Sequence, residues 1–166
     1  GVRYAEDPTL AWVSLVNEGN IESPGADGYA TRPGWTAAWT AWLTQKRRED
    51  PAAYAGITDR IPNRKTGSRE GAAFTLFLRD VESRFVQRTK AALRAWGCKA
   101  LVTDMNNCTG VLVGMAPVRG FDCDYVDTHF YVDHPSFFER PWALPSFCPN
   151  ENPLRNESLG AAAVTT

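Results

Sequence analysis

The sequence predicts an α/β protein with parallel strands. Three short apolar segments with strand character, residues 10–16, 98–103 and 124–132, alternate with helical or irregular segments. The chain has 166 residues, of which 43% are hydrophobic, and this suffices for one globular domain with a sizeable core. We therefore expect a single domain over residues 1–166. In folds of this class, ligands gather at the carboxyl ends of the strands.

The first predicted strand is "LAWVSLV", residues 10–16. The run is too short and too uniformly apolar for a surface helix, which favours a buried strand of the parallel type. Immediately after it come Asn17 and Glu18. A parallel strand that ends here delivers the Glu18 carboxylate to the edge where ligands bind.

A long excursion follows the first strand. Gly and Pro residues predict a loop over 19–34, and Pro51 ends a predicted helix over 35–49. One side of that helix is apolar, and residues 50–70 are polar and irregular. We interpret residues 20–70 as an inserted loop and helix region. The apolar side of its helix holds Trp35, Ala38, Trp39, Trp42 and Leu43.

The clearest helix is predicted over residues 71–96, and Gly97 supplies its stop. Apolar residues recur along it with the helical spacing of three and four. They are Phe74, Phe77, Leu78, Val81, Phe85, Ala92, Leu93 and Trp96.

The second strand is predicted at "CKALVT", residues 98–103, and residues 104–122 fit either a short helix or a packed loop. Asp104, Asn106 and Asn107 lie where substrate hydrogen bonding is plausible by position, but turn formation and capping are the commoner uses of such residues.

The third strand is predicted at "DYVDTHFYV", residues 124–132. Because side chains alternate along a strand, Asp127, His129 and Tyr131 share one polar face. Residues 133–166 are rich in Pro, Asn and Ser and predict no long element.

The charges exclude two classes of partner. The 18 basic and 19 acidic residues nearly cancel and are scattered along the chain. Nucleic-acid and membrane-surface proteins concentrate basic residues instead, so we expect neither partner.

Three stretches resemble, in order, the middle of the cellulase-like glycoside hydrolases of the TIM-barrel clan. "RYAEDPTLAWVSLVNEGN" is similar to the fourth barrel strand, where the acid/base Glu follows an Asn. "FLRDVESRFVQRTKAALRAWGCKALVTD" is similar to the following helix and fifth strand, and "YVDTHFYVDHPSF" resembles the sixth strand with its His-x-Tyr. The resemblance implies a portion of a (β/α)8 TIM barrel, about strands four to six with their helices.

The resemblance also implies a reaction, the retaining hydrolysis of a β-linked polysaccharide or oligosaccharide. Glu18 would be the general acid/base, Asn17 would bond the sugar hydroxyl beside the scissile bond, and His129 with Tyr131 would shape the subsite. Trp142, in "FERPWALP", is the candidate for an aromatic platform under a sugar ring. The two-carboxylate mechanism needs no cofactor, so we expect none.

The second carboxylate of that mechanism has no match in the chain. In the family it ends the seventh strand, whereas Glu139, Glu151 and Glu157 here follow no apolar strand. A complete barrel takes about 250 residues. We therefore expect a fragment, or a heavily reduced relative, without the nucleophile strand. An open three-strand piece would associate through its sheet edges or with missing barrel segments.

The barrel also implies a pairing of the four cysteines. Cys98 with Cys123, and Cys108 with Cys148, would lie at matching ends of neighbouring strands. Such disulfides would indicate an oxidising compartment and a secreted, extracellular protein. Four reduced thiols are the alternative.

Two other functions compete with the glycosidase. A zinc-dependent hydrolase could use Asp127, His129, Asp133 and His134, but a regular strand turns the two histidines to opposite faces, so we expect no metal site. A non-catalytic carbohydrate-binding module would stack sugars on exposed aromatic side chains. Its candidates are Trp35, Trp39, Trp142 and Tyr131.

Overall fold

The computed structural model describes most of the chain as two compact units. The first unit comprises residues 1–10 and 20–99, and the second comprises residues 11–19 and 100–166. The first is helical, and the second holds the sheets. The described residues are 3–17, 21, 28, 32–62, 68–107, 116–128 and 135–147.

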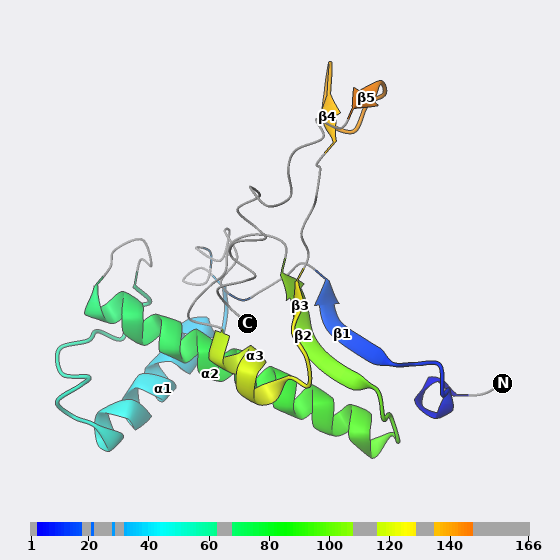
Figure 1. Cartoon of the computed structure of the whole chain (residues 1–166). Coiled ribbons are helices and arrows are strands. Elements are labelled where there is room, and N and C mark those ends of the chain that lie inside the picture. The colour runs from blue at the N-terminus through cyan, green and yellow to red at the C-terminus, as the bar shows by residue number, and fades with distance from the viewer. Residues whose placement is uncertain are drawn as a thin grey trace. The chain divides into compact units, whose positions relative to one another are not determined.

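Two long helices form the first unit (Figure 1), which also holds the short 3-10 turn η1 (Tyr4–Glu6). Helix α1 (Trp35–Glu49) has the predicted bounds. Helix α2 (Arg69–Ala95) begins two residues before its predicted start, because the Ser68 hydroxyl accepts a hydrogen bond of 3.1 Å from the Gly71 amide. Gly97 follows the helix with φ 89°, a conformation that favours glycine, as the predicted stop requires.

The core of the helical unit is aromatic. Trp39 is completely buried, and its ring lies 5.4 Å from that of Trp42 and 5.6 Å from that of Phe77. The Trp42 indole donates a 2.8 Å hydrogen bond to the Asp80 carboxylate, which ties α1 to α2. The predicted apolar side of α1 is thus confirmed at Trp39, Trp42 and Leu43, whereas Ala38 is exposed.

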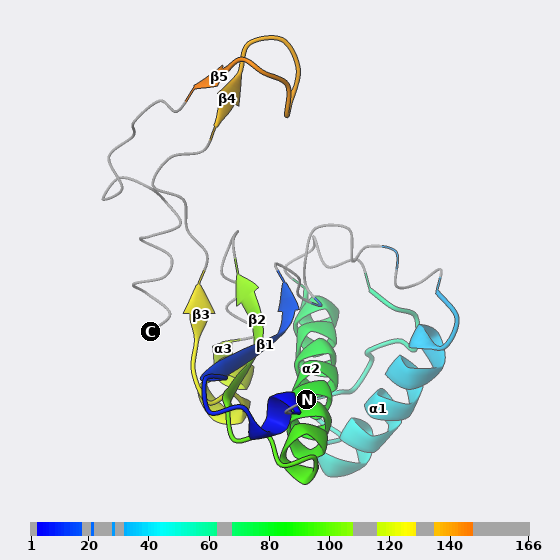
Figure 2. The same ribbon diagram turned by 90° about the vertical axis from the view of Figure 1, so that its right-hand side faces the viewer.

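Three parallel strands form the larger sheet of the second unit (Figures 1 and 2). They are β1 (Trp12–Asn17), β2 (Leu101–Asn107) and β3 (Asp127–Thr128), and they lie side by side in chain order. The parallel pairing agrees with the expectation from sequence. The described residues form no barrel, so a portion of a (β/α)8 barrel stays a prediction.

The expectation that the first strand is buried is wrong. Trp12 is 65% exposed and Ser14 is also exposed. The reason is that β1 is an edge strand, which pairs with β2 on one side and with no other strand among the described residues. Association through this open edge stays a prediction.

The second strand lies further along the chain than predicted. It begins at Leu101 and continues to Asn107, so Asp104, Asn106 and Asn107 are strand residues and not turn residues. Of the two alternatives for residues 104–122, the structure has a short helix at its end, α3 (Ala116–Asp122).

Asp124 joins the segment after α3 to the second strand. Its amide donates a 2.8 Å hydrogen bond to the Val102 carbonyl, and its carboxylate accepts a 3.0 Å hydrogen bond from the Val102 amide. One residue therefore satisfies both backbone groups of Val102, next to the point where β3 begins.

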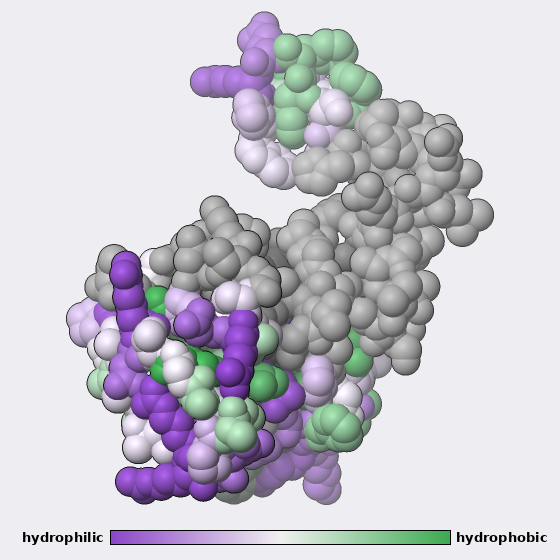
Figure 3. Space-filling model, turned by 90° about the vertical axis from the view of Figure 1, so that its left-hand side faces the viewer, coloured by the Kyte–Doolittle hydropathy of each residue, from purple (hydrophilic) through white to green (hydrophobic). Residues whose placement is uncertain are grey.

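A small antiparallel sheet lies in the segment for which no long element was expected. Strands β4 (Ser136–Phe137) and β5 (Ser146–Phe147) pair with each other. Figure 3 shows hydrophobic side chains gathered on this hairpin, next to hydrophilic ones. Strands of two residues are too short for an alternating pattern, which explains why the sequence did not predict them.

Candidate functional site

The carboxyl ends of the three parallel strands meet at one edge of the sheet (Figure 2). There Asn17 of β1 is the Cα partner of Asn106 in β2, which is in turn the partner of Asp127 in β3. Neighbouring strands are about 4.8 Å apart, so Asn17 and Asp127 lie about 10 Å apart across this row. We call these three residues the edge row.

The structure describes two of the five predicted site residues. Asn17 is the exposed last residue of β1 and lies in the edge row. Trp142 lies in the turn region between β4 and β5, whereas Asn17 belongs to the parallel sheet. The predicted acid/base Glu18 and the subsite residues His129 and Tyr131 fall outside the described residues.

Asp127 belongs to the edge row. The sequence predicted it only as a residue on the polar face of the third strand and as one of four possible zinc ligands. Its negative charge contributes to a raised pKa of Tyr125, although burial of that phenol is the larger cause. The alternation of side chains predicted a polar face for the third strand, whereas the partner of Asp127 depends on a strand register that alternation does not fix.

A buried ion pair lies two residues before Asn106 in β2. Asp104 is completely buried, and its Oδ1 atom lies 3.9 Å from Nε of the nearly buried Arg119 in α3. The Thr103 hydroxyl donates a 3.4 Å hydrogen bond to the same Asp104 oxygen. Charge attraction between these residues therefore connects α3 to the strand that carries the middle of the edge row.

The predicted disulfide between Cys98 and Cys123 is wrong, because both residues are free thiols. Cys98 belongs to the helical unit, where it is buried in the turn after α2. Cys123 belongs to the sheet unit and hydrogen-bonds to Thr103 and Asp104. The other predicted pair, Cys108 with Cys148, lies outside the described residues.

Burial raises the pKa of the Cys123 thiol to about 11, and the negative charge of Asp104 adds to this effect. Because the thiolate is the reactive form, we expect iodoacetamide to modify Cys123 slowly at pH 8 and at a rate that rises until about pH 11. Peptide mapping by mass spectrometry after timed alkylation measures this rate. In urea the rate should level off near the ordinary thiol pKa, and an identical profile in the folded protein would contradict the prediction.

The same shift gives a direction for stability. The folded protein holds the Cys123 proton more tightly than the unfolded chain does. The protonated thiol therefore contributes to the free energy of unfolding below the ordinary thiol pKa, and this contribution is lost as the pH rises through the raised pKa of the folded protein.

The metal alternative is not tested by the structure. Among the described ranges, no three His, Cys, Asp or Glu side chains lie close enough to hold a metal ion. Of the proposed set only Asp127 is described, and His129, Asp133 and His134 are not.

Aromatic side chains that could stack on sugars are found at the β4–β5 hairpin. Trp142 is 78% exposed, and its ring centroid lies 5.3 Å from that of Phe137. Its φ of 64° is left-handed, which is uncommon for a bulky residue and frequent at functional positions. By contrast Trp39 is completely buried, and Trp35 is half-buried with its ring 6.0 Å from that of Phe77. Trp142 is thus the exposed member of the predicted set among these three.

No protein-family model, curated protein or solved structure matches the chain. Within the described residues, none of the helices combines the length and the apolar character that a bilayer crossing requires. Any functional assignment therefore depends on the residues themselves.

Proposed function

We propose that the chain carries the acid/base part of a retaining glycoside hydrolase that acts on a β-linked polysaccharide or oligosaccharide. The observation that carries this proposal is the position of Asn17. It ends a parallel strand in the same row as Asp127, and Glu18 is the next residue of the chain. Polar groups at the carboxyl edge of parallel strands are where folds of this class bind ligands.

The proposed chemistry assigns a role to each residue. Glu18 protonates the glycosidic oxygen as the bond breaks and later deprotonates the attacking water. Asn17 hydrogen-bonds the neighbouring sugar hydroxyl, while His129 and Tyr131 line the subsite. A second carboxylate about 5 Å from Glu18 attacks the anomeric carbon. No glutamate of this chain matches the position that the family gives to this nucleophile.

Release of reducing ends from β-glucans and β-mannans tests the proposal. The chain, its Glu18→Gln variant and the natural gene product that carries the chain are compared. Hydrolysis that depends on Glu18, in the chain or in the gene product, supports the proposal. Hydrolysis that the substitution leaves unchanged overturns it, and so does the absence of hydrolysis in both proteins.

A carbohydrate-binding module is the second candidate, and the exposed Trp142 favours it. An exposed indole beside a second aromatic ring offers a flat apolar surface to the face of a pyranose ring. This candidate requires glycan binding without turnover, and binding that does not depend on Glu18.

Both candidates predict that Trp142→Ala weakens the binding of β-linked hexasaccharides about tenfold, which corresponds to about 1.4 kcal/mol. Isothermal titration calorimetry measures the affinity. Trp96→Ala is the matched control, since Trp96 is similarly exposed but belongs to the helical unit. Equal losses in the two variants, or none in Trp142→Ala, would remove the hairpin from the binding site.

A further inference from the structure

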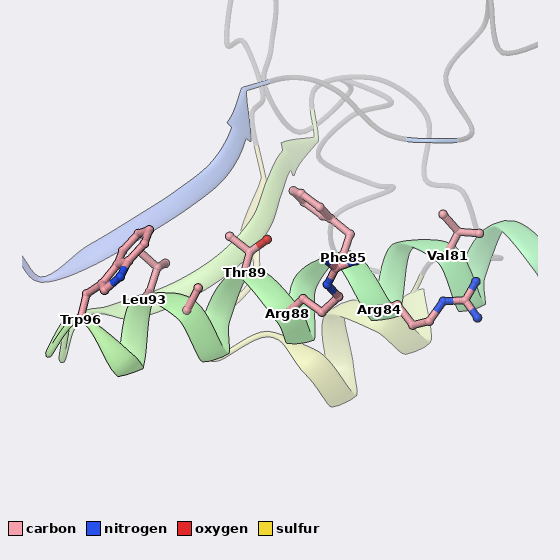
Figure 4. Close-up of a pocket in the computed structure, with 8 residues that line it drawn as sticks. Val81, Arg84, Phe85, Arg88, Thr89, Leu93 and Trp96 are labelled. Atoms are coloured by element: carbon pink, nitrogen blue, oxygen red, sulfur yellow. The ribbon is translucent and has the colours of Figure 1, made fainter. Parts of the chain in front are cut away.

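The C-terminal half of α2 carries an open groove with a volume of about 570 Å³ (Figure 4). Its apolar side chains lie along one side of the helix, with two arginines beside them. They come from residues three or four apart in sequence, which an α-helix places on one face. The lining includes Val81, Phe85, Leu93, Trp96, Arg84 and Arg88.

The groove exposes large apolar side chains. Phe85 is 43% exposed and Trp96 is 70% exposed, whereas Phe74 and Phe77 in the first half of the same helix are buried. Contiguous apolar side chains on a surface are typical of interaction sites.

The charge beside the groove is positive. Arg84 and Arg88 are both exposed, and neither makes an ion pair in the part of the chain that the structure describes. They are four residues apart on one helix face, so their like charges repel each other. No acidic residue occurs in the sequence between Glu82 and Asp104.

We propose that this groove binds an acidic amphipathic helix of a protein partner. Apolar side chains of that helix would lie between Phe85 and Trp96, and carboxylates four residues apart would pair with Arg84 and Arg88. The distance from Val81 to Trp96 is roughly 22 Å at 1.5 Å per residue, which matches four turns of a partner helix. Binding of this kind is the helix-in-groove mode, in which apolar anchors give affinity and charge gives orientation.

The hollow form of this surface favours a helix over an anionic membrane. A groove receives a ridge of side chains, which a partner helix offers and a flat lipid surface does not. Lys90 and Arg94 extend the basic residues over the polar face of α2, as in helices that bind membranes, so the vesicle measurement below separates the two surfaces.

Fluorescence anisotropy with two designed 16-residue peptides tests the proposal. Both peptides present leucines at helical spacing, and one carries two glutamates four residues apart where the other carries two lysines. We expect the glutamate peptide to bind at least tenfold more tightly than the lysine peptide. Equal binding of the two peptides, or binding of neither, overturns the proposal.

Charge reversal makes the test specific to the groove. The double variant Arg84→Glu with Arg88→Glu should lose at least tenfold in affinity for the glutamate peptide and gain affinity for the lysine peptide. The control double variant reverses two exposed arginines elsewhere in the helical unit, Arg48→Glu and Arg60→Glu, and should bind as the unchanged protein does.

Two outcomes with the variants contradict the proposal. An equal loss in the control variant would show that the net charge of the protein, and not the groove, attracts the peptide. Sedimentation of the protein with phosphatidylserine vesicles that depends on Arg84 and Arg88, without selectivity between the peptides, would assign the groove to a lipid surface. Circular dichroism of each variant verifies that α2 is folded.

Discussion

In whichever protein hydrolyses β-glycans, the chain or the gene product that carries it, Glu18→Gln is expected to lower the rate by about 10²- to 10⁴-fold, the range that general acid catalysis typically contributes. The amide has nearly the shape of the carboxylic acid but cannot donate a proton to the departing oxygen. The size of the loss should therefore depend on how much the leaving group needs that proton.

Two substrates separate this role from a structural one. A dinitrophenyl β-glycoside has a leaving group that departs without protonation, so Glu18→Gln should slow formation of its glycosyl-enzyme far less than it slows glycan hydrolysis. Added azide should then accelerate turnover by replacing the water that Glu18 no longer activates. Glu22→Gln is the matched control, because this glutamate is four residues away and has no proposed role. Equal losses with both substrates, and no effect of azide, would contradict the acid/base assignment.

Asp104→Val is expected to lower the free energy of unfolding by about 3–5 kcal/mol, because it leaves the nearly buried Arg119 guanidinium without its carboxylate. The carboxylate has further partners in Thr103 and Cys123, so this substitution should cost more than Arg119→Met. Urea unfolding measures both free energies.

A double-mutant cycle isolates the charge pair. When both residues are replaced by apolar ones, no buried charge is left unpaired, so the double variant should be considerably more stable than the sum of the single losses predicts. Asp104→Asn keeps the side-chain shape and tests the charge alone. It should also move the alkylation profile of Cys123 to lower pH, since the Asp104 charge contributes to the raised pKa of that thiol. Additive losses and an unchanged alkylation profile would contradict this description of the pair.

The helices could be predicted from the sequence because their evidence is local. The apolar residues spaced from Trp35 to Leu43 and from Phe74 to Leu78 form the aromatic core between α1 and α2 in the structure. The stop at Gly97 was likewise visible in one residue, since few other residues adopt the conformation found there.

The strands were predicted in order and pairing type but not in burial or register. The apolar pattern of a strand is the same in the sequence whether or not neighbouring elements cover that strand. Trp12 is exposed because β1 is at the edge of its sheet. Asp104 looked like a turn residue because a carboxylate in a strand interior needs a buried partner. That partner, Arg119, is 15 residues away in α3, a segment for which the sequence allowed either a short helix or a packed loop.

The candidate site could be located from sequence only as strand ends. That Asn17 ends a strand followed from the abrupt change of polarity after the apolar run. That Asp127 shares its row depends on two successive strand registers, which arise from long-range packing and not from any local pattern.

The two hydrogen bonds between Asp124 and Val102 have a consequence for the order of folding. They close a loop between residues 22 positions apart, whereas β1 reaches β2 only after the whole helical unit has been traversed along the chain. Short loops cost less entropy to close, so β2, α3 and the start of β3 should assemble early and β1 should join last. In pulsed hydrogen exchange during refolding, the amide of Val102 would then be protected before that of Leu101, whose hydrogen bond runs to Ala11.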